Sequence, residues 1–230
     1  MDVISSWSSG KDSCLALYKT MSQGHTIRYL LNFISKEHKR CCFHGIDSEL
    51  IQLQSNLIGI PLVQKEVSPD MNAYESEFKE AVSALKGKNI GGMVFGDIYL
   101  DEHKEWVERV CHDLEITPIE PLWNIPTEQI LREFIDLGFT AIVVSCKADV
   151  LGKEILGQTI DYQFLEKLKE RNICVCGENG EFHTFVTDGP CFKKKIKITK
   201  TKKLLKEGFW KHWYLDIQDW CVEEKNDSLS

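Results

Sequence analysis

Six residues near the start of the chain, Ser8-Ser9-Gly10-Lys11-Asp12-Ser13, combine hydroxyls, a lysine and a carboxylate between two regular segments. An apolar run precedes them, and a helical pattern of apolar residues follows them. A turn from a strand into a helix leaves backbone N–H groups without partners at the positive end of the helix dipole, so it is suited to phosphate. The loop therefore predicts a nucleoside triphosphate as substrate.

The loop differs from two common phosphate-binding motifs. Asp12 follows Lys11 where the Gly-x-x-x-x-Gly-Lys-Ser/Thr pattern needs Ser or Thr, and the Gly-x-Gly-x-x-Gly fingerprint is also missing from the loop. The alternative interpretation is an ordinary serine-rich turn whose helix N-cap is Ser13. A serine at position 9 is compatible with the loop on the condition that the backbone there is not left-handed.

A second group of polar residues lies at 176–185, where Asn179-Gly180 predicts a tight turn between two strands. Two carboxylates, an amide, an imidazole and a hydroxyl occur within seven residues: Glu178, Asn179, Glu181, His183 and Thr184. This density favours a site for a charged, polar substrate. A solvent-exposed hairpin with an incidental histidine is the alternative.

Apolar runs alternate with amphipathic segments up to residue 124, which predicts a parallel sheet covered by helices. Strands are expected at 2–7, 27–34, 61–67, 91–97 and 117–122, and helices at 13–22, 47–58, 73–86 and 101–114. Ligands of such sheets bind beyond the carboxyl ends of the strands. The first loop would lie at that edge, as would Gly96-Asp97 after the fourth strand.

The alternation stops near 123–127, where we expect a domain boundary. A helix from Thr127 that Gly138 ends, and a buried strand at 141–144, come next. A helix at 161–172 and strands at 173–176, 182–187, 195–200 and 209–222 complete a smaller α+β domain over 125–222. Residues 223–230 are expected to form a frayed tail.

The composition of the 230 residues is that of a globular protein, with 43% hydrophobic residues and a net charge of −7. The longest apolar run is shorter than the roughly 20 residues that span a bilayer, so no membrane segment is expected. Nine cysteines without a C-x-x-C pair argue against a disulfide framework and for a cytoplasmic location. Zinc bound by Cys174, Cys176, His183 and Cys191 is disfavoured, because the spacing matches no common structural zinc pattern.

Residues 193–206 contain eight lysines and no acidic residue, against the acidic balance of the whole chain. Lysines at this density are typical of an edge strand, where they prevent pairing with another sheet. A docking patch for an RNA or ribosome-associated partner is the alternative, although the overall charge provides no strong nucleic-acid signal. Four aromatic residues are expected in the core rather than at a homo-oligomer interface: Trp210, Trp213, Tyr214 and Trp220.

Together these segments resemble the diphthine–ammonia ligase family of PP-loop (N-type) ATP pyrophosphatases. The first loop is similar to the family's Ser-Gly-Gly-x-Asp-Ser signature, with Ser9 in place of a glycine. Residues 177–185 are similar to Gly-Glu-Gly-Gly-Glu-Phe/Tyr-x-Thr-Phe, with Asn179 in place of a glycine. The resemblance extends over nearly the whole chain and also includes residues 47–62, 96–98, 122–123, 151–157 and 188.

The resemblance implies a fold and a reaction. The fold is an α/β, HUP-type (adenine nucleotide alpha hydrolase-like) parallel sheet with flanking helices, followed by the smaller α+β domain. The enzyme would use ATP and Mg²⁺ to adenylate a carboxylate, either diphthine on elongation factor 2 or a related group. Ammonia would then form the amide, with release of AMP and pyrophosphate. Residues 1–124 would bind ATP, and residues 125–222 would bind the acceptor.

The expected roles follow the two motifs. Ser8 to Ser13 would hold the leaving phosphates, with Lys11 offsetting charge on the transferring group. Asp12 and Asp97 are candidate Mg²⁺ partners, and a helix cap is the alternative for Asp97. Further residues assigned to ATP are Gly96 and the strand backbone at Asn32 and Phe33. Residues assigned to the acceptor and ammonia are Glu178, Asn179, Gly180, Glu181, His183 and Thr184, with Glu178 and Glu181 as candidate catalytic carboxylates.

Two other functions stay open. A tRNA-thiolating PP-loop enzyme would use residues 193–206 and a sulfur-carrying cysteine at 14, 111 or 146; the acidic balance and the missing C-x-x-C oppose it. A nucleotide-binding module without catalysis is the other, and the presence of Lys11 and Asp12 in the loop opposes it.

Overall fold

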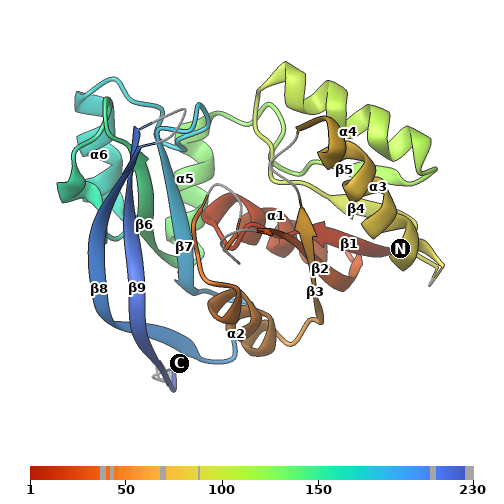
Figure 1. Ribbon diagram of the computed structural model, residues 1–230, viewed down its shortest axis with the longest axis horizontal. Helices are drawn as coiled ribbons and strands as arrows, with labels where there is room; N and C mark the ends of the chain where they lie inside the picture. The colour runs from red at the N-terminus through yellow and green to blue at the C-terminus, as the bar shows by residue number, and fades with distance from the viewer. Residues whose placement is uncertain (37–39, 42–43, 68–70, 88, 208–210, 226–230) are drawn as a thin grey trace. The chain divides into compact units, whose positions relative to one another are not determined.

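The fold is described from a computed structural model, for residues 1–36, 40–41, 44–67, 71–87, 89–207 and 211–225 (Figure 1). The chain forms two compact units. Unit 1 comprises Met1–Ser8, Asp12–Cys42 and Ile60–Pro126, and unit 2 comprises Ser9–Lys11, Phe43–Gly59 and Thr127–Ser230. The three middle residues of the first loop therefore belong with unit 2, whereas the residues on either side of them belong with unit 1.

Unit 1 is built on a parallel five-stranded sheet in the order β3-β2-β1-β4-β5. Its strands are β1 (Asp2–Ser6), β2 (Thr26–Ser35), β3 (Leu62–Val67), β4 (Gly92–Val94) and β5 (Thr117–Ile119). The inner strands β1 and β4 are buried runs, as expected for a sheet covered on both faces. Helices α1 (Lys11–Ser22), α3 (Met71–Lys86) and α4 (Asp101–Asp113) connect the strands. The predicted parallel sheet with flanking helices is confirmed.

The strand order reverses at β1, which lies between β2 and β4. In a doubly wound sheet this reversal opens a crevice at the carboxyl ends of the two diverging strands. The first loop directly follows β1, and Gly96-Asp97 closely follows β4. A Cβ atom on Gly96 would lie 3.0 Å from both the Asp12 carbonyl carbon and the Ser13 nitrogen, so only glycine permits this close approach of the two segments.

The core of unit 1 is centred on Phe78 of α3, which is 1% exposed. Its ring stacks on Phe33 of β2 at 5.4 Å between centroids and meets Trp106 of α4 edge-on at 4.8 Å. These aromatic contacts fasten α3 and α4 to the same sheet and thereby fix the end of β2 that carries Asn32 and Phe33.

Unit 2 is built on an antiparallel four-stranded sheet in the order β7-β6-β9-β8. Its strands are β6 (Thr140–Lys147), β7 (Phe182–Asp188), β8 (Lys195–Glu207) and β9 (Lys211–Glu223). Its helices are α2 (Ser48–Ile58), α5 (Thr127–Asp136), α6 (Tyr162–Glu170) and a 3-10 turn at Lys153–Ile155 that the sequence did not predict. Gly138 adopts a φ of 79° after α5, as expected for the residue that ends a helix.

The strand predicted at 173–176 is wrong. These residues form turns, in which the Gly177 N–H donates to the Cys174 carbonyl. The partner of β7 is β6, so Asn179-Gly180 ends a loop that leads into β7 and does not connect two paired strands. The apolar character that suggested a strand instead buries Val175 and Cys176 as loop residues, which burial pattern alone cannot distinguish from a short strand.

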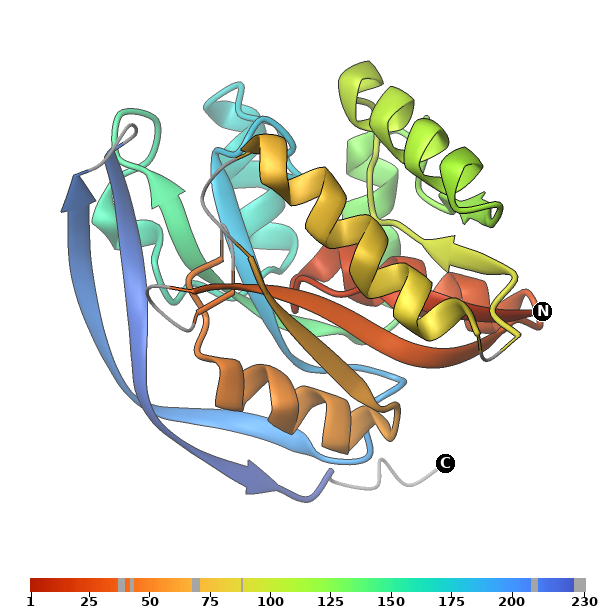
Figure 2. The same cartoon turned by 45° about the vertical axis from the view of Figure 1, so that its right-hand side comes forward.

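The lysine-rich segment forms an edge strand, as predicted. Among the residues that the structure describes, β8 pairs with β9 alone, and Figure 2 shows the two as a long, strongly curved ribbon. The expected burial of the aromatic cluster is wrong for Trp213, Tyr214 and Trp220, which are half-buried on β9, while Trp210 lies outside the described residues. At the end of the chain Lys225 pairs with Asp188 at 2.8 Å, and the rest of the predicted tail, 226–230, lies outside the described residues.

Within the described part of the chain, no helix combines the length and the apolar character needed to cross a bilayer.

Candidate functional site

Strand β7 holds the middle of the first loop. The Lys11 N–H donates to the Thr184 hydroxyl at 3.0 Å, and the Val186 N–H donates to the Ser9 carbonyl at 3.0 Å. Thr184 is 2% exposed and Ser9 is fully buried, so both hydrogen bonds are shielded from water. Two motifs that the sequence separates by more than 170 residues therefore meet in unit 2.

A residue that the sequence analysis missed completes this contact. Gln54 of α2 is fully buried, and its side-chain amide donates to the carbonyls of Ser9, at 3.3 Å, and Val186, at 2.6 Å. The available signal was its position on α2, four residues after Leu50 and four before Ile58, on the buried face of the helix. A glutamine on an apolar helix face has to find polar partners inside the protein.

The backbone of Ser9 does not meet the condition that this position avoid the left-handed region. Its φ is 73°, in the left-handed region that favours glycine. Its hydroxyl is also buried, with no hydrogen-bond partner among the residues that the structure describes. The hydrogen bonds from Val186 and Gln54 to the Ser9 carbonyl stabilise this strained conformation.

Lys11 is almost completely buried, with 3% of its surface exposed. Its ammonium group donates to the Cys176 carbonyl and lies 5.5 Å from the centroid of the Phe182 ring. The polar loop before β7 thus supplies an acceptor and an aromatic face to the one cation of the first loop.

The loop before β7 is organised by its own side chains. The Glu181 carboxylate accepts from both the Asn179 backbone N–H and the Asn179 amide, each at 3.0 Å. Lys147 of β6 donates to the Asn179 carbonyl at 2.6 Å. Gly177 and Gly180 adopt φ values of 68° and 76°, and a Cβ atom on Gly177 would lie 2.8 Å from the Phe182 carbonyl. Glu181 therefore fixes the turn of this loop.

Two imidazoles lie beside these residues. The ring centroids of His44 and His183 are 4.8 Å apart, and His44 Nδ1 lies 2.9 Å from the Thr184 carbonyl oxygen. The pKa of His44 is lowered to about 4, mainly because the ring is buried. The hydrogen bond to Thr184 raises this pKa, and the charge of Lys11 lowers it. Burial, followed by the charges around it, also places the pKa of His183 well below its usual value. His44 belongs to no motif, and no pattern in the sequence would have identified it.

The remaining loop residues belong with unit 1. The Ser8 hydroxyl donates to the Ser13 hydroxyl at 3.1 Å. Because α1 begins at Lys11, the alternative of Ser13 as its N-cap is wrong. Asp97 accepts from His103 Nδ1 at 2.9 Å. The residue that caps α4 is Leu100, so the alternative of a cap at Asp97 is also wrong.

The side chain of Asn32 is engaged in structural contacts. It is 1% exposed, and its amide donates to the Trp7 carbonyl at 2.7 Å and to Cys41 Sγ at 3.2 Å. These contacts join the end of β1 to β2. The ring of Phe33 lies in the aromatic core, where it stacks on Phe78.

Cysteine chemistry finds little support in the fold. Cys174, Cys176, His183 and Cys191 do not gather into a metal-ligating group within the described ranges. The three cysteines considered as sulfur carriers, at 14, 111 and 146, are all fully buried. Burial raises the pKa of the Cys111 and Cys146 thiols to about 12, so neither is a thiolate at neutral pH.

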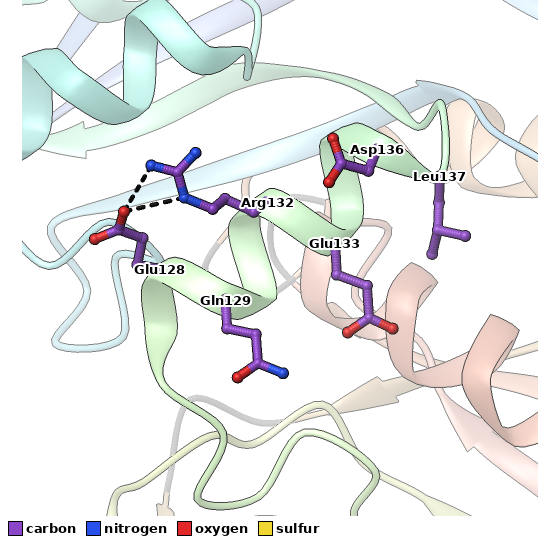
Figure 3. Close-up of a pocket in the computed structure, with 6 residues that line it drawn as sticks. All are labelled: Glu128, Gln129, Arg132, Glu133, Asp136 and Leu137. Atoms are coloured by element: carbon purple, nitrogen blue, oxygen red, sulfur yellow. Dashed lines mark hydrogen bonds and ion pairs between the residues drawn. The ribbon is translucent and has the colours of Figure 1, made fainter.

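A separate pocket lies along α5 in unit 2, lined by Glu128, Gln129, Arg132, Glu133, Asp136 and Leu137 (Figure 3). The Arg132 guanidinium donates to the Glu128 carboxylate at 2.7 and 3.0 Å. None of the residues predicted for the site lines this pocket.

The geometry defines a class of protein, namely an α/β protein with a polar loop at the switch point of its parallel sheet. The diphthamide synthase N-terminal domain matches residues 1–118, and the diphthamide synthase C-terminal domain matches residues 126–219. The chain belongs to the diphthamide synthase family.

Individual relatives agree with this assignment. A diphthine–ammonia ligase of Mus musculus is 29% identical over 96% of this chain and 92% of its own, and one of Danio rerio is 28% identical over 89% of both. One of Schizosaccharomyces pombe is 26% identical over 98% of this chain but only 40% of its own length. A solved structure, described as a predicted subunit of tRNA methyltransferase from Methanocaldococcus jannaschii, covers 83% of this chain with 16% identity and a TM-score of 0.47.

The strain at Ser9 yields a stability prediction. Ser9→Gly removes the Cβ atom from a left-handed backbone and should increase the free energy of unfolding by about 1 kcal/mol relative to Ser9→Ala, which keeps the Cβ. Urea unfolding of the two variants and the unaltered chain measures the difference. Equal stabilities of the glycine and alanine variants would contradict the strained conformation.

The low pKa of His44 predicts a pH dependence of stability. Since its folded pKa is about 4 and its usual value is 6.5, the unfolded chain binds a proton first as the pH falls through this window. The free energy of unfolding should therefore decrease between these values, and His44→Asn should lose about 2 kcal/mol less than the unaltered chain from about pH 7.5 to about pH 5. Urea titrations at both pH values test this, and equal losses in the two proteins would refute it.

Proposed function

We propose that the chain is an ATP-dependent diphthine–ammonia ligase. It would adenylate the carboxylate of diphthine on elongation factor 2, or a related carboxylate, and amidate it with ammonia, releasing AMP and pyrophosphate. The observation that supports this most directly is the family match over both halves of the chain, together with contact between the two motifs at Lys11 and Thr184.

Adenylation solves a chemical problem. A carboxylate does not react directly with ammonia because the leaving group would be hydroxide or oxide, whereas AMP leaves readily. The first loop is suited to the first half of this reaction. Residues Ser8 to Ser13 bind the triphosphate at the start of α1, where backbone N–H groups and the helix dipole favour anions. Lys11, held by Cys176, offsets the negative charge that develops in transfer.

The adenine ring is assigned to the backbone of β2 at Asn32 and Phe33. The Leu31 carbonyl accepts from Trp7 N–H at 2.8 Å, and the register between β1 and β2 ends at Ser6 and Leu31. Alternation along the strand directs the backbone of Phe33 to this same side, beyond the end of β1. Backbone donor and acceptor groups at a strand end can recognise the edge of a purine.

A divalent metal fits the carboxylates of unit 1. Asp12 and Asp97 come from neighbouring segments, because a Cβ on Gly96 would lie 3.0 Å from the Asp12 carbonyl carbon. His103 orients the Asp97 carboxylate by a hydrogen bond, as partners of metal-ligating carboxylates commonly do. We assign Asp12 and Asp97 to Mg²⁺, which when bound supplies positive charge to the phosphates.

Unit 2 is assigned to the acceptor. Residues Glu178 to Thr184 offer carboxylates, an amide, an imidazole and a hydroxyl in one loop and strand. Glu178 and Glu181 are the candidate catalytic carboxylates, and Glu181 also organises the turn through Asn179. On this proposal residues 1–124 bind ATP and residues 125–222 bind the acceptor, and the protein acts in the cytoplasm.

The proposal is tested with purified chain, ATP, Mg²⁺, ammonium and diphthine-bearing elongation factor 2. AMP should form only when both ammonia and the acceptor are present, in equal amount to the amide measured by mass spectrometry. AMP formation that depends on tRNA instead would favour the thiolating alternative, against which the buried cysteines stand. Tight ATP binding without AMP formation would favour the non-catalytic alternative.

The role of Lys11 yields a kinetic prediction. Lys11→Met removes the ammonium group but keeps an apolar chain of similar length, so the fold should persist. Pyrophosphate release should fall by about 100-fold or more, because a buried charge at the transferring group is lost. Lys202→Ala, at an exposed position on β8, is the matched control. Full pyrophosphate release by the methionine variant would exclude Lys11 from the reaction.

The role of Glu181 is tested separately. Glu181→Gln should leave ATP affinity within about twofold and reduce amide formation by about 100-fold, the effect expected when the base that converts bound ammonium to ammonia is lost. Isothermal titration with a non-hydrolysable ATP analogue measures the first quantity and amide yield the second. Weakened ATP binding would assign this loop to the nucleotide instead.

A further inference from the structure

His44 contacts the first loop although no motif includes it. A Cβ atom on Gly10 would lie 2.6 Å from His44 Cε1, so the imidazole lies directly against the loop backbone. The ring also lies 4.8 Å from His183, centroid to centroid. His44, Gly10, Lys11, His183 and Thr184 all belong to unit 2, and their contacts are internal to it.

One hydrogen bond determines the tautomer of His44. Nδ1 lies 2.9 Å from the Thr184 carbonyl oxygen, which can only accept. Nδ1 therefore carries the proton, and Nε2 of the neutral ring presents a lone pair. The same threonine accepts from Lys11 N–H through its hydroxyl, so the histidine and the loop are aligned by a single residue.

The surroundings keep this imidazole neutral. Burial lowers its pKa to about 4, and the Lys11 charge contributes in the same direction. The other groups of this neighbourhood are His183 on β7, His212 on β9 and Lys147 on β6, and the pKa of His183 is lowered too. Burial and the positive charge of Lys11 therefore disfavour protonation of Nε2 in advance of the reaction at neutral pH.

The amide-forming step needs a proton acceptor. We propose that His44 Nε2 takes the proton that the ammonia nitrogen loses as it attacks the acyl adenylate. This inference rests on the proposed ligase activity. The nitrogen–carbon bond forms, the bond from the carbonyl carbon to the phosphate oxygen breaks, and AMP leaves with the electron pair. A nitrogen that is bonding to a carbonyl carbon is far more acidic than free ammonium, so a weak base suffices.

The test replaces His44 by asparagine, whose amide can still donate to the Thr184 carbonyl but has no basic nitrogen. Ammonia-dependent amide formation should fall by about 100-fold or more, the usual contribution of a general base. Pyrophosphate release in the first turnover, measured in the presence of the acceptor, and the affinity for ATP should stay within about twofold, since adenylation precedes the step at issue. His112→Asn, at an exposed position on α4, is the matched control.

Hydroxylamine separates a base from a structural residue. Its nitrogen loses a proton to water more readily than that of ammonia, so hydroxamate formation by His44→Asn should fall by less than about tenfold. Three outcomes would each overturn the inference: equal losses with both nucleophiles, an unchanged rate of amide formation with ammonia, or a loss of pyrophosphate release in the first turnover. His44→Gln, which also lacks a basic nitrogen, must show the same dependence if the asparagine variant does not fold. Absence of ammonia-dependent AMP formation by the unaltered chain would contradict the ligase proposal itself.

Discussion

The hydrogen bond from the Lys11 N–H to the Thr184 hydroxyl joins two segments that lie 173 residues apart. It is buried, and two further buried contacts to the Ser9 carbonyl, from Val186 and Gln54, reinforce it. A loop of small residues has high conformational entropy, and tertiary hydrogen bonds of this kind hold it in one conformation. The left-handed backbone of Ser9 persists because these partners fix it.

Burial around this contact also determines the electrostatics of the site. The Lys11 ammonium lies against the Cys176 carbonyl and the Phe182 ring, so a cation is placed in surroundings of low polarity. The interaction of this charge with an anionic ligand would be stronger there than in water. The same low-polarity surroundings keep His44 and His183 neutral, so acceptors and a cation coexist within a few residues.

The sequence predicted the elements of unit 1 well because each carries a strong local signal. Buried strands are apolar throughout, and helices repeat apolar residues every three to four positions. The wrong predictions share one cause: an apolar side chain can be buried in a loop, or only half-buried on a strand, as well as in the core. Val175 and Cys176 are buried in a loop, and Trp213 and Trp220 lie half-buried on β9. The hydrophobicity of a side chain predicts that it will be buried, but it does not predict which kind of secondary structure will bury it.

The sequence by itself determined the two polar motifs and the parallel sheet, since the motif at Ser8–Ser13 and the one at 177–185 are contiguous runs and the strands and helices carry local periodicity. Only the tertiary structure decided that Thr184 holds Lys11, that Gln54 supports Ser9, and that His44 lies against Gly10. These contacts join segments remote in the chain, and each depends on the pairing of β7 with β6 and on the packing of α2. Such pairings form because side chains from the whole unit are buried together. No local periodicity in the sequence at these residues therefore predicts them.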